Sequence, residues 1–123
     1  MDGEITAEEL KELLDAETPP RVVDIRSPGQ FRRRHIPGSE NVPFPELTGR
    51  IEEFDGDDRV VTVCPHGQAS MQAARLIGSF EGFDGRVDSL EPGLEGWPHG
   101  FESGKTEAET PTATRGEGPD APF

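Results

Sequence analysis

Cysteine occurs once in the 123 residues of this chain, at position 64. A single thiol forms no internal disulfide and cannot supply a zinc site built from four thiolates. No apolar stretch approaches the ~20 residues that a membrane-spanning helix needs. The first residues, Met-Asp-Gly-Glu, are acidic where a secretory signal would be basic and then apolar. We therefore expect a protein of a reducing cytoplasm, without a membrane partner, a metal or another cofactor.

Lysine is scarce as well. The chain has two lysines against ten arginines, and its 25 acidic and 12 basic residues give a net charge of -13. Such acidity argues against a nucleic-acid partner, because phosphate repels it. Residues 1–101 alone carry a net charge of -10, a self-repulsion that salt screens. A composition with few lysines and many carboxylates resembles that of proteins from salt-loving archaea. The alternative is an acidic surface that only aids solubility.

Large apolar residues are few and unevenly distributed. Leucine, isoleucine, valine and phenylalanine number 26, and 25 of them lie within residues 1–101. This distribution predicts one small domain over residues 1–101, with a single core and little spare stability. Residues 102–123 are rich in Thr, Glu, Gly and Pro. We interpret them as an acidic, disordered tail and assign no structure to them.

Short apolar runs bounded by Pro, Gly or Asp predict buried strands over residues 21–26, 59–63 and 86–90. Residues 41–43 form a short strand at most, because Pro43 cannot donate to a sheet. Capping residues and apolar spacing predict a helix of about ten residues after Thr6, and helices or helical turns over 27–31, 47–54, 70–80 and 94–101. This alternation indicates an α/β fold with a small, mainly parallel central sheet and helices on both faces.

Cys64 follows the second predicted strand and opens a loop that leads into a helix beginning at Ser70. Ligands of open α/β sheets bind outside the carboxyl ends of strands. Backbone N–H groups of such a loop can surround the sulfur, and the helix N-terminus adds positive potential, so that the thiolate is favoured. Gly67 permits the curl because it tolerates a positive φ. The position indicates a nucleophilic cysteine; the alternative is a buried cysteine that packs as a small apolar side chain.

Five short motifs, in order, resemble those of single-domain rhodaneses over residues 4–101. The first three are Asp24-Ile25-Arg26, Arg34-His35-Ile36-Pro37-Gly38 and Asn41-Val42-Pro43. The fourth is the loop from Cys64, with Gly67 at its fourth place and Ser70, Ala73 and Ala74 in the helix that follows. The last is Leu90-Glu91-Pro92-Gly93 with Trp97. Each motif is short, and their order and separations make the resemblance specific.

The resemblance implies a rhodanese-like fold and a sulfurtransferase or persulfide carrier. Cys64 would accept a sulfane sulfur from thiosulfate or a protein persulfide and pass it to a thiophilic acceptor, such as a thiol or a sulfur-carrier protein. Asp24, Arg26 and His35 would support the site. The loop would hold the persulfide through Pro65, His66, Gly67, Gln68, Ala69 and Ser70.

This loop departs from the pattern of the family. Many small rhodaneses have Arg two places after the loop glycine, where this chain has Ala69. Others place basic residues directly after the cysteine, where this chain has Pro65 and then His66. Gln30 and Arg34 stand where the family usually has Glu and Gly. A cationic contact for an anionic donor is therefore weakened, and a binding or regulatory module with little catalytic activity stays open as the alternative.

Two further interpretations concern charge. A phosphatase or arsenate reductase on a related fold needs Arg at the seventh place of the loop to bind a tetrahedral oxyanion, and this chain has Ser70 there. Arg32, Arg33 and Arg34 form the only basic cluster in the sequence. This cluster is either a solvated face that neutralises nearby carboxylates, or an anion-attracting rim or docking patch.

Overall fold

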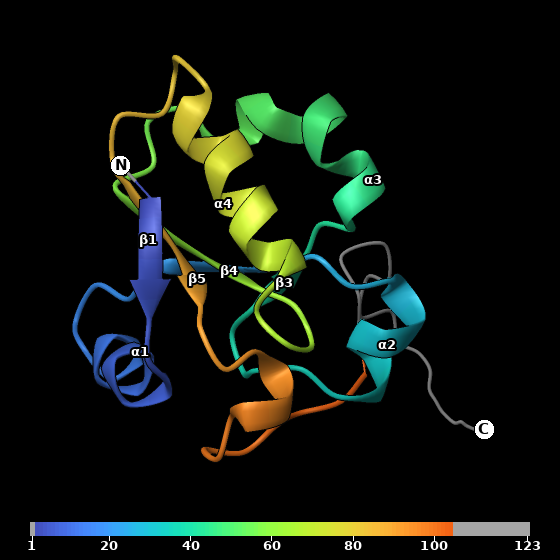
Figure 1. The fold of residues 1–123 in the computed structure, drawn as a ribbon. Helices are drawn as coiled ribbons and strands as arrows, with labels where there is room; N and C mark the ends of the chain where they lie inside the picture. Colours follow the sequence, from blue (N-terminus) through green and yellow to red (C-terminus); the bar gives the residue numbers. More distant parts are fainter. Residues whose placement is uncertain (1, 105–123) are drawn as a thin grey trace, which may run out of the picture.

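Five parallel strands form one sheet in the order β1-β5-β4-β2-β3, with β4 at its centre. A computed structural model describes residues 2–104 of the chain (Figure 1). The expected α/β fold with a parallel central sheet is confirmed. The strands are β1 (Asp2–Ile5), β2 (Arg21–Asp24), β3 (Glu40–Asn41), β4 (Arg59–Val63) and β5 (Arg86–Leu90).

Helices cover both faces of the sheet, as expected. One face carries α1 (Ala7–Leu14) and the short 3-10 helix η2 (Leu94–Gly96), and α2 (Pro28–Arg33) follows β2. The other face carries α3 (Phe44–Leu47), the 3-10 helix η1 (Thr48–Phe54) and α4 (Ala69–Ser79).

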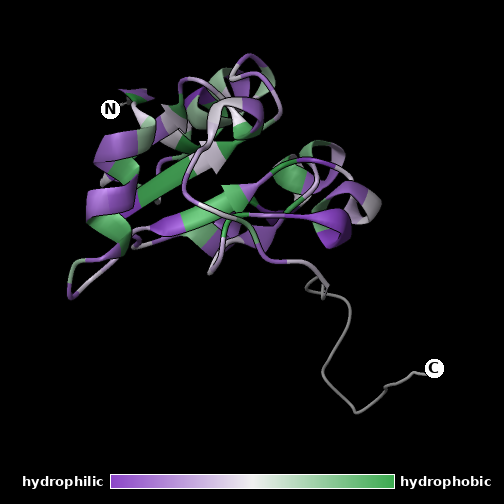
Figure 2. Ribbon diagram, turned by 90° about the horizontal axis from the view of Figure 1, so that it is seen from below, coloured by the Kyte–Doolittle hydropathy of each residue, from purple (hydrophilic) through white to green (hydrophobic). Residues whose placement is uncertain are grey.

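The core explains why β4 consists almost entirely of β-branched residues. In β4, Val60 packs on the α4 side of the sheet, whereas Val61 and Val63 pack on the α1 side. Both faces of the strand are therefore buried, and Figure 2 shows hydrophobic residues concentrated in the strands. Trp97 lies in the α1-side core with 5% of its surface exposed.

Some elements differ from the sequence-based expectation. The pattern does not predict β1, because this edge strand contains a single large apolar residue, Ile5. The strand expected over 21–26 ends at Asp24, since the N–H of Arg26 turns back to the Asp24 carboxylate at 3.0 Å. The helix expected over 47–54 is the short α3 continued by η1, in which Gly49 disfavours a regular α-helix. Within residues 94–101, only η2 is helical.

Backbone pairing continues past Phe101. The N–H and C=O groups of His35 and Glu102 exchange hydrogen bonds of 2.8 and 2.9 Å as an isolated antiparallel bridge. The N–H of Gly104 donates to the carbonyl of Arg32 at 2.8 Å. Glu102 belongs to the segment that sequence analysis assigns to the tail; residues 105–123 of that segment lie outside the described residues. No described helix is long and apolar enough to cross a membrane.

Candidate active site

Cys64 lies at the carboxyl end of the central strand. β4 ends at Val63, and the loop that follows enters α4 at Ala69. The end of the neighbouring strand β2 is in register, with Asp24 opposite Val63. The fold therefore brings the Cys64 loop and the Asp24–Arg26 segment to the same edge of the sheet. Parallel sheets place ligands at this edge.

Three hydrogen-bonding groups surround the sulfur of Cys64. The N–H groups of Gly67 and Ser70 donate to Sγ at 3.0 and 3.3 Å, and the Ser70 hydroxyl oxygen lies 3.2 Å from Sγ. Cys64 is 3% exposed. The loop thus surrounds the sulfur with hydrogen-bond donors and not only with apolar side chains. This arrangement stabilises an anionic sulfur.

The surroundings of Cys64 influence its ionisation in opposite directions. Burial raises the pKa of the thiol and is the largest single influence. The hydrogen bonds with the side chain of Ser70 and the backbone of Ser70, His66 and Gly67 lower it, and together they outweigh burial. The pKa of Cys64 therefore lies below the ordinary value of a cysteine thiol, which increases the fraction of nucleophilic thiolate at neutral pH.

A layer of buried hydroxyl groups lies beneath the sulfur. The Ser70 and Ser89 hydroxyl oxygens are 2.6 Å apart, and the Thr62 hydroxyl donates to the carbonyl of Ser70 at 2.7 Å. All three residues have 0% exposure. Sequence reasoning missed Ser89 and Thr62. In the sequence, each is a polar residue inside a predicted strand, at a position on the face of the sheet that α4 covers.

The loop packs tightly against the turn that follows β5. The N–H groups of Leu94 and Glu95 donate to the carbonyls of Cys64 and Pro65 at 2.8 and 3.0 Å. Gly67 has a φ of +86°, and a Cβ placed on it would lie 2.2 Å from the carbonyl oxygen of Glu91. This closeness leaves no room for a side chain at the centre of the loop.

The outer rim of the loop carries little charge. His66, Gln68 and Ala69 are exposed, and Pro65 is partly buried. Within the described residues, the His66 ring makes no hydrogen bond or ion pair. The structure thus brings the predicted loop residues together around Cys64, but it shows no cation held over the sulfur by the loop itself.

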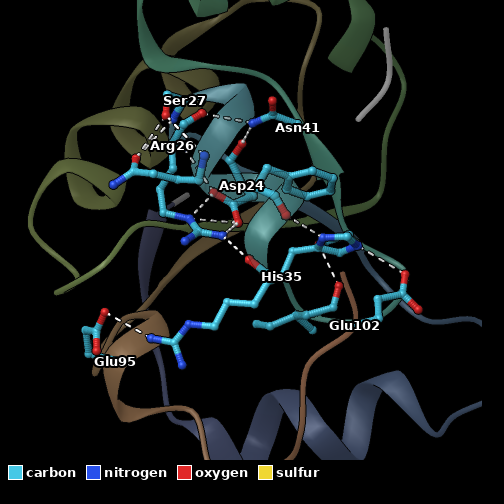
Figure 3. A network of polar contacts seen from close by, with 12 residues as sticks. Asp24, Arg26, Ser27, His35, Asn41, Glu95 and Glu102 are labelled. Carbon is cyan, nitrogen blue, oxygen red and sulfur yellow. Dashed lines mark hydrogen bonds and ion pairs between the residues drawn. The ribbon is translucent and has the colours of Figure 1, made fainter. Parts of the chain in front are cut away.

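Asp24 and Arg26 form a nearly buried pair where β2 ends (Figure 3). The Arg26 guanidinium donates to the Asp24 carboxylate at 2.8–3.1 Å and to the carbonyl of Arg34 at 2.6 Å. The side-chain amide of Asn41 donates to the carbonyls of Asp24 and Arg26, both at 2.9 Å. Gln30 makes no hydrogen bond to this pair. It forms a capping box with Ser27 at the start of α2.

His35 is fixed by contacts on three sides (Figure 3). Its Nδ1 lies 2.7 Å from the carbonyl of Phe31, and its Nε2 lies 3.1 Å from the carboxylate of Glu102. The ring stacks on that of Phe31, with 3.8 Å between the ring centroids. These contacts tie α2 to the chain that follows Phe101.

Arg34 links the basic cluster to the turn that packs against the loop. Arg34 pairs with Glu95 at 3.2 Å, and its guanidinium lies 4.6 Å from the centre of the Phe101 ring. Arg32 and Arg33 are exposed. The two arginines tied to the surroundings of the loop, Arg26 and Arg34, are thus each paired with a carboxylate already. Among the described residues, no group of three or more His, Cys, Asp or Glu side chains is placed to hold a metal.

Comparison with known proteins places this arrangement in a family. A model of the rhodanese-like domain matches residues 6–99. The chain is 31% identical over 104 residues to the putative sulfur carrier protein YrkF of Bacillus subtilis (strain 168), a match that covers 85% of this chain and 52% of YrkF. It is 37% identical over 82 residues to the thiosulfate sulfurtransferase GlpE of Stutzerimonas stutzeri (strain A1501), covering 67% of this chain and 73% of that protein.

Solved structures agree with this match. A thiosulfate sulfurtransferase from Pseudomonas aeruginosa superposes with a TM-score of 0.74 at 29% identity, over 85% of this chain and 21% of that chain. A rhodanese-like domain protein from Staphylococcus aureus gives a TM-score of 0.74 over 85% of this chain and 100% of that chain; at 24% identity this likeness shows the fold alone. Because the family model spans most of the described chain, and β2 to β5, the loop and the cysteine lie within its bounds, this protein belongs to the rhodanese-like domain family.

Proposed function

We propose that this protein is a sulfurtransferase or persulfide carrier that uses Cys64 as its nucleophile. The observation that carries the proposal is the cradle around the only thiol of the chain, in which two N–H groups and one hydroxyl converge on Sγ. Donors in this arrangement stabilise a thiolate before the reaction and a persulfide after it. The names of YrkF and GlpE, a sulfur carrier and a thiosulfate sulfurtransferase, support the same chemistry.

The proposed reaction has two displacements at sulfur. The Cys64 thiolate attacks the sulfane sulfur of the donor, a new S–S bond forms at Sγ, and the donor's own bond breaks with its electron pair. Sulfite leaves when the donor is thiosulfate, and a thiolate leaves when it is a protein persulfide. An acceptor thiolate, free or on a sulfur-carrier protein, then attacks the outer sulfur and restores the Cys64 thiolate. Because this cycle needs a reduced thiol, we place it in the cytoplasm.

A binding or regulatory module with little catalytic activity is the second candidate. Ala69 favours it, since the loop ends without the cation that would hold an anionic donor. The nearly buried pairing of Arg26 with Asp24 strengthens this point, because the charge of that guanidinium is already balanced.

Mass spectrometry of the intact protein separates the two candidates. The reduced protein is incubated with thiosulfate and, in parallel, with a protein-bound persulfide, and the product is mapped by peptide. The carrier is supported by the mass of one added sulfur on the peptide that contains Cys64, removed again by an acceptor thiol. No added sulfur from either donor rejects the carrier and leaves the binding module.

Placing a cation at the loop end is expected to improve thiosulfate as a donor. Ala69 is exposed at the first residue of α4, five residues after Cys64. Ala69→Arg supplies a planar guanidinium that binds oxyanions through paired hydrogen bonds. We expect kcat/KM for thiosulfate to rise about tenfold, which corresponds to about 1.4 kcal/mol and one charge-assisted hydrogen bond.

Gln72→Arg is the matched control for Ala69→Arg. Gln72 is also exposed on α4, and the substitution changes the net charge by the same amount one turn further from the loop. A gain confined to Ala69→Arg supports a local contact, and equal gains indicate general attraction of the anion. If Ala69→Arg leaves thiosulfate turnover unchanged or lower, the missing arginine does not limit the reaction, and a docked protein persulfide becomes the favoured donor.

We also propose that the domain is adapted to high salt. Residues 1–101 carry a net charge of -10, and molar salt screens the resulting repulsion over distances beyond about 3 Å. Thermal melts across a salt series are expected to show Tm rising with salt, where each gain of about 1 kcal/mol raises Tm by about 4–8 °C. Sucrose solutions provide the uncharged control. A Tm that does not respond to salt contradicts the proposal.

A further inference from the structure

The buried hydroxyl pair beneath Cys64 has a role that the loop alone does not explain. Ser89 lies on β5 and contacts Ser70 rather than the sulfur, with 2.6 Å between the two hydroxyl oxygens. We propose that Ser89 is a positioning residue, which directs the hydrogen of the Ser70 hydroxyl toward the Cys64 sulfur whenever that sulfur is anionic. The inference rests on the proposed function of Cys64 as a nucleophile and adds a residue that the family motifs do not contain.

Hydrogen counting supports this direction. Each hydroxyl has one hydrogen, so across the contact between Ser70 and Ser89 one group donates and the other accepts. A thiolate has no hydrogen to give, and the Ser70 hydroxyl, 3.2 Å from Sγ, must therefore be the donor in that contact. Ser70 then has no hydrogen left for Ser89, and Ser89 must donate to Ser70. The thiolate form fixes the whole chain in the order Ser89, Ser70, Cys64.

The neutral thiol allows the opposite order. The S–H group can donate to Ser70, Ser70 to Ser89, and Ser89 to the carbonyl of Gly67. This last contact is long, at 3.5 Å, so the chain ends on a weak acceptor when the sulfur is neutral. In the thiolate form, both hydroxyl hydrogens lie on short contacts that are polarised by the negative charge. Ser89 therefore stabilises the thiolate more than the thiol.

Because the Ser89 hydroxyl is buried, bulk water cannot easily take over its hydrogen bond to Ser70. Ser70 and Ser89 are 0% exposed, between the β4–β5 part of the sheet and α4. Removing the Ser89 hydroxyl leaves the oxygen of Ser70 without this donor, in a place that bulk water does not reach. A double-mutant cycle can therefore isolate the contribution of the relay.

The test measures ionisation of Cys64 rather than sulfur transfer. Iodoacetamide labelling is followed as a function of pH; because the chain has one cysteine, the label reports Cys64 alone. For Ser89→Ala we expect a higher apparent pKa and a labelling rate, at a pH below that pKa, that is about threefold lower than in the wild type. Ser70→Ala removes the direct donor and is expected to lower this rate about tenfold.

The remaining variants decide whether Ser89 acts through Ser70. In the Ser70→Ala background, Ser89→Ala is expected to have no further effect. In the otherwise wild-type protein, Ser89→Thr keeps the hydroxyl and is expected to keep the wild-type pH profile. Ser39→Ala is the matched control, because the Ser39 hydroxyl donates to the carbonyl of Ile36 at 2.6 Å and takes no part in the relay. Its pH profile should equal that of the wild type.

Several outcomes overturn the relay. It is rejected if Ser89→Ala titrates like the wild type, or if Ser89→Ala lowers the rate further in the Ser70→Ala background. Thermal melts establish that each variant is folded. If Ser89→Ala does not fold, Ser89→Cys, whose S–H group is only a weak donor, is compared with Ser89→Thr. Ser89→Cys is then expected to have the higher apparent pKa of the two at Cys64. A wild type that forms no persulfide but shows these titrations rejects the proposed function and leaves the relay intact.

Discussion

Cys64→Ser is expected to abolish sulfur transfer, with a loss of at least about a thousandfold in kcat/KM for any donor. A serine hydroxyl remains protonated near neutral pH and is a far weaker nucleophile than a thiolate. The chain offers no second thiol that could take over, because Cys64 is its only cysteine. Turnover is measured with thiosulfate and with a protein persulfide, using the acceptor thiol in excess.

The fold should tolerate this change, and that makes the experiment decisive. The serine oxygen can accept from the same N–H groups of Gly67 and Ser70 that now reach Sγ. We therefore expect the free energy of unfolding to change by no more than about 1.5 kcal/mol. Turnover that persists in a folded Cys64→Ser protein would mean that sulfur passes directly from donor to acceptor, and the covalent cycle proposed above would be wrong.

The sequence pattern predicts some elements well because their cause is local. The strands expected over 59–63 and 86–90 coincide with β4 and β5. In β4, β-branched residues that are buried on both faces of the sheet give a clear local signal. The capping box of Thr6 and Glu9 predicts the start of α1, and both of its hydrogen bonds are present. β1 has no such local cause, because it is held by its pairing with β5, far along the chain.

In the candidate site too, features with a local cause are predicted and features that depend on distant pairing are not. The sequence predicts the loop around Cys64, because a glycine at its fourth place and a helix start at its end are signals contained within a few residues. Ser89 is separated from Ser70 by 19 positions, and only the parallel pairing of β4 and β5 brings it beneath the loop. The pairing of Arg34 with Glu95 spans 61 positions. Contacts of this kind depend on the topology, which no local pattern encodes.

Gly67→Ala is expected to cost the protein about 2–5 kcal/mol of stability, the sum of a left-handed backbone penalty and of overpacking. Gly67 has a φ of +86°, which L side chains rarely adopt. A Cβ at this position would lie 2.2 Å from the carbonyl oxygen of Glu91 and 3.2 Å from that of Leu90. Both neighbours are backbone atoms of the chain that leaves β5, so the clash cannot be relieved by turning a side chain.

Gly38→Ala separates the two contributions to this cost. Gly38 has nearly the same φ, +85°, but a Cβ there would meet nothing within 4 Å. We expect Gly38→Ala to lower the free energy of unfolding by the backbone penalty alone, about 1–2 kcal/mol. Urea unfolding of both variants measures this difference. Gly67→Ala should also slow iodoacetamide labelling of Cys64 below its pKa, because displacing the loop removes the N–H donor 3.0 Å from Sγ. Equal stability losses in the two variants would show that the loop is free to move away from Glu91, and that the close packing seen here does not hold the cradle in place.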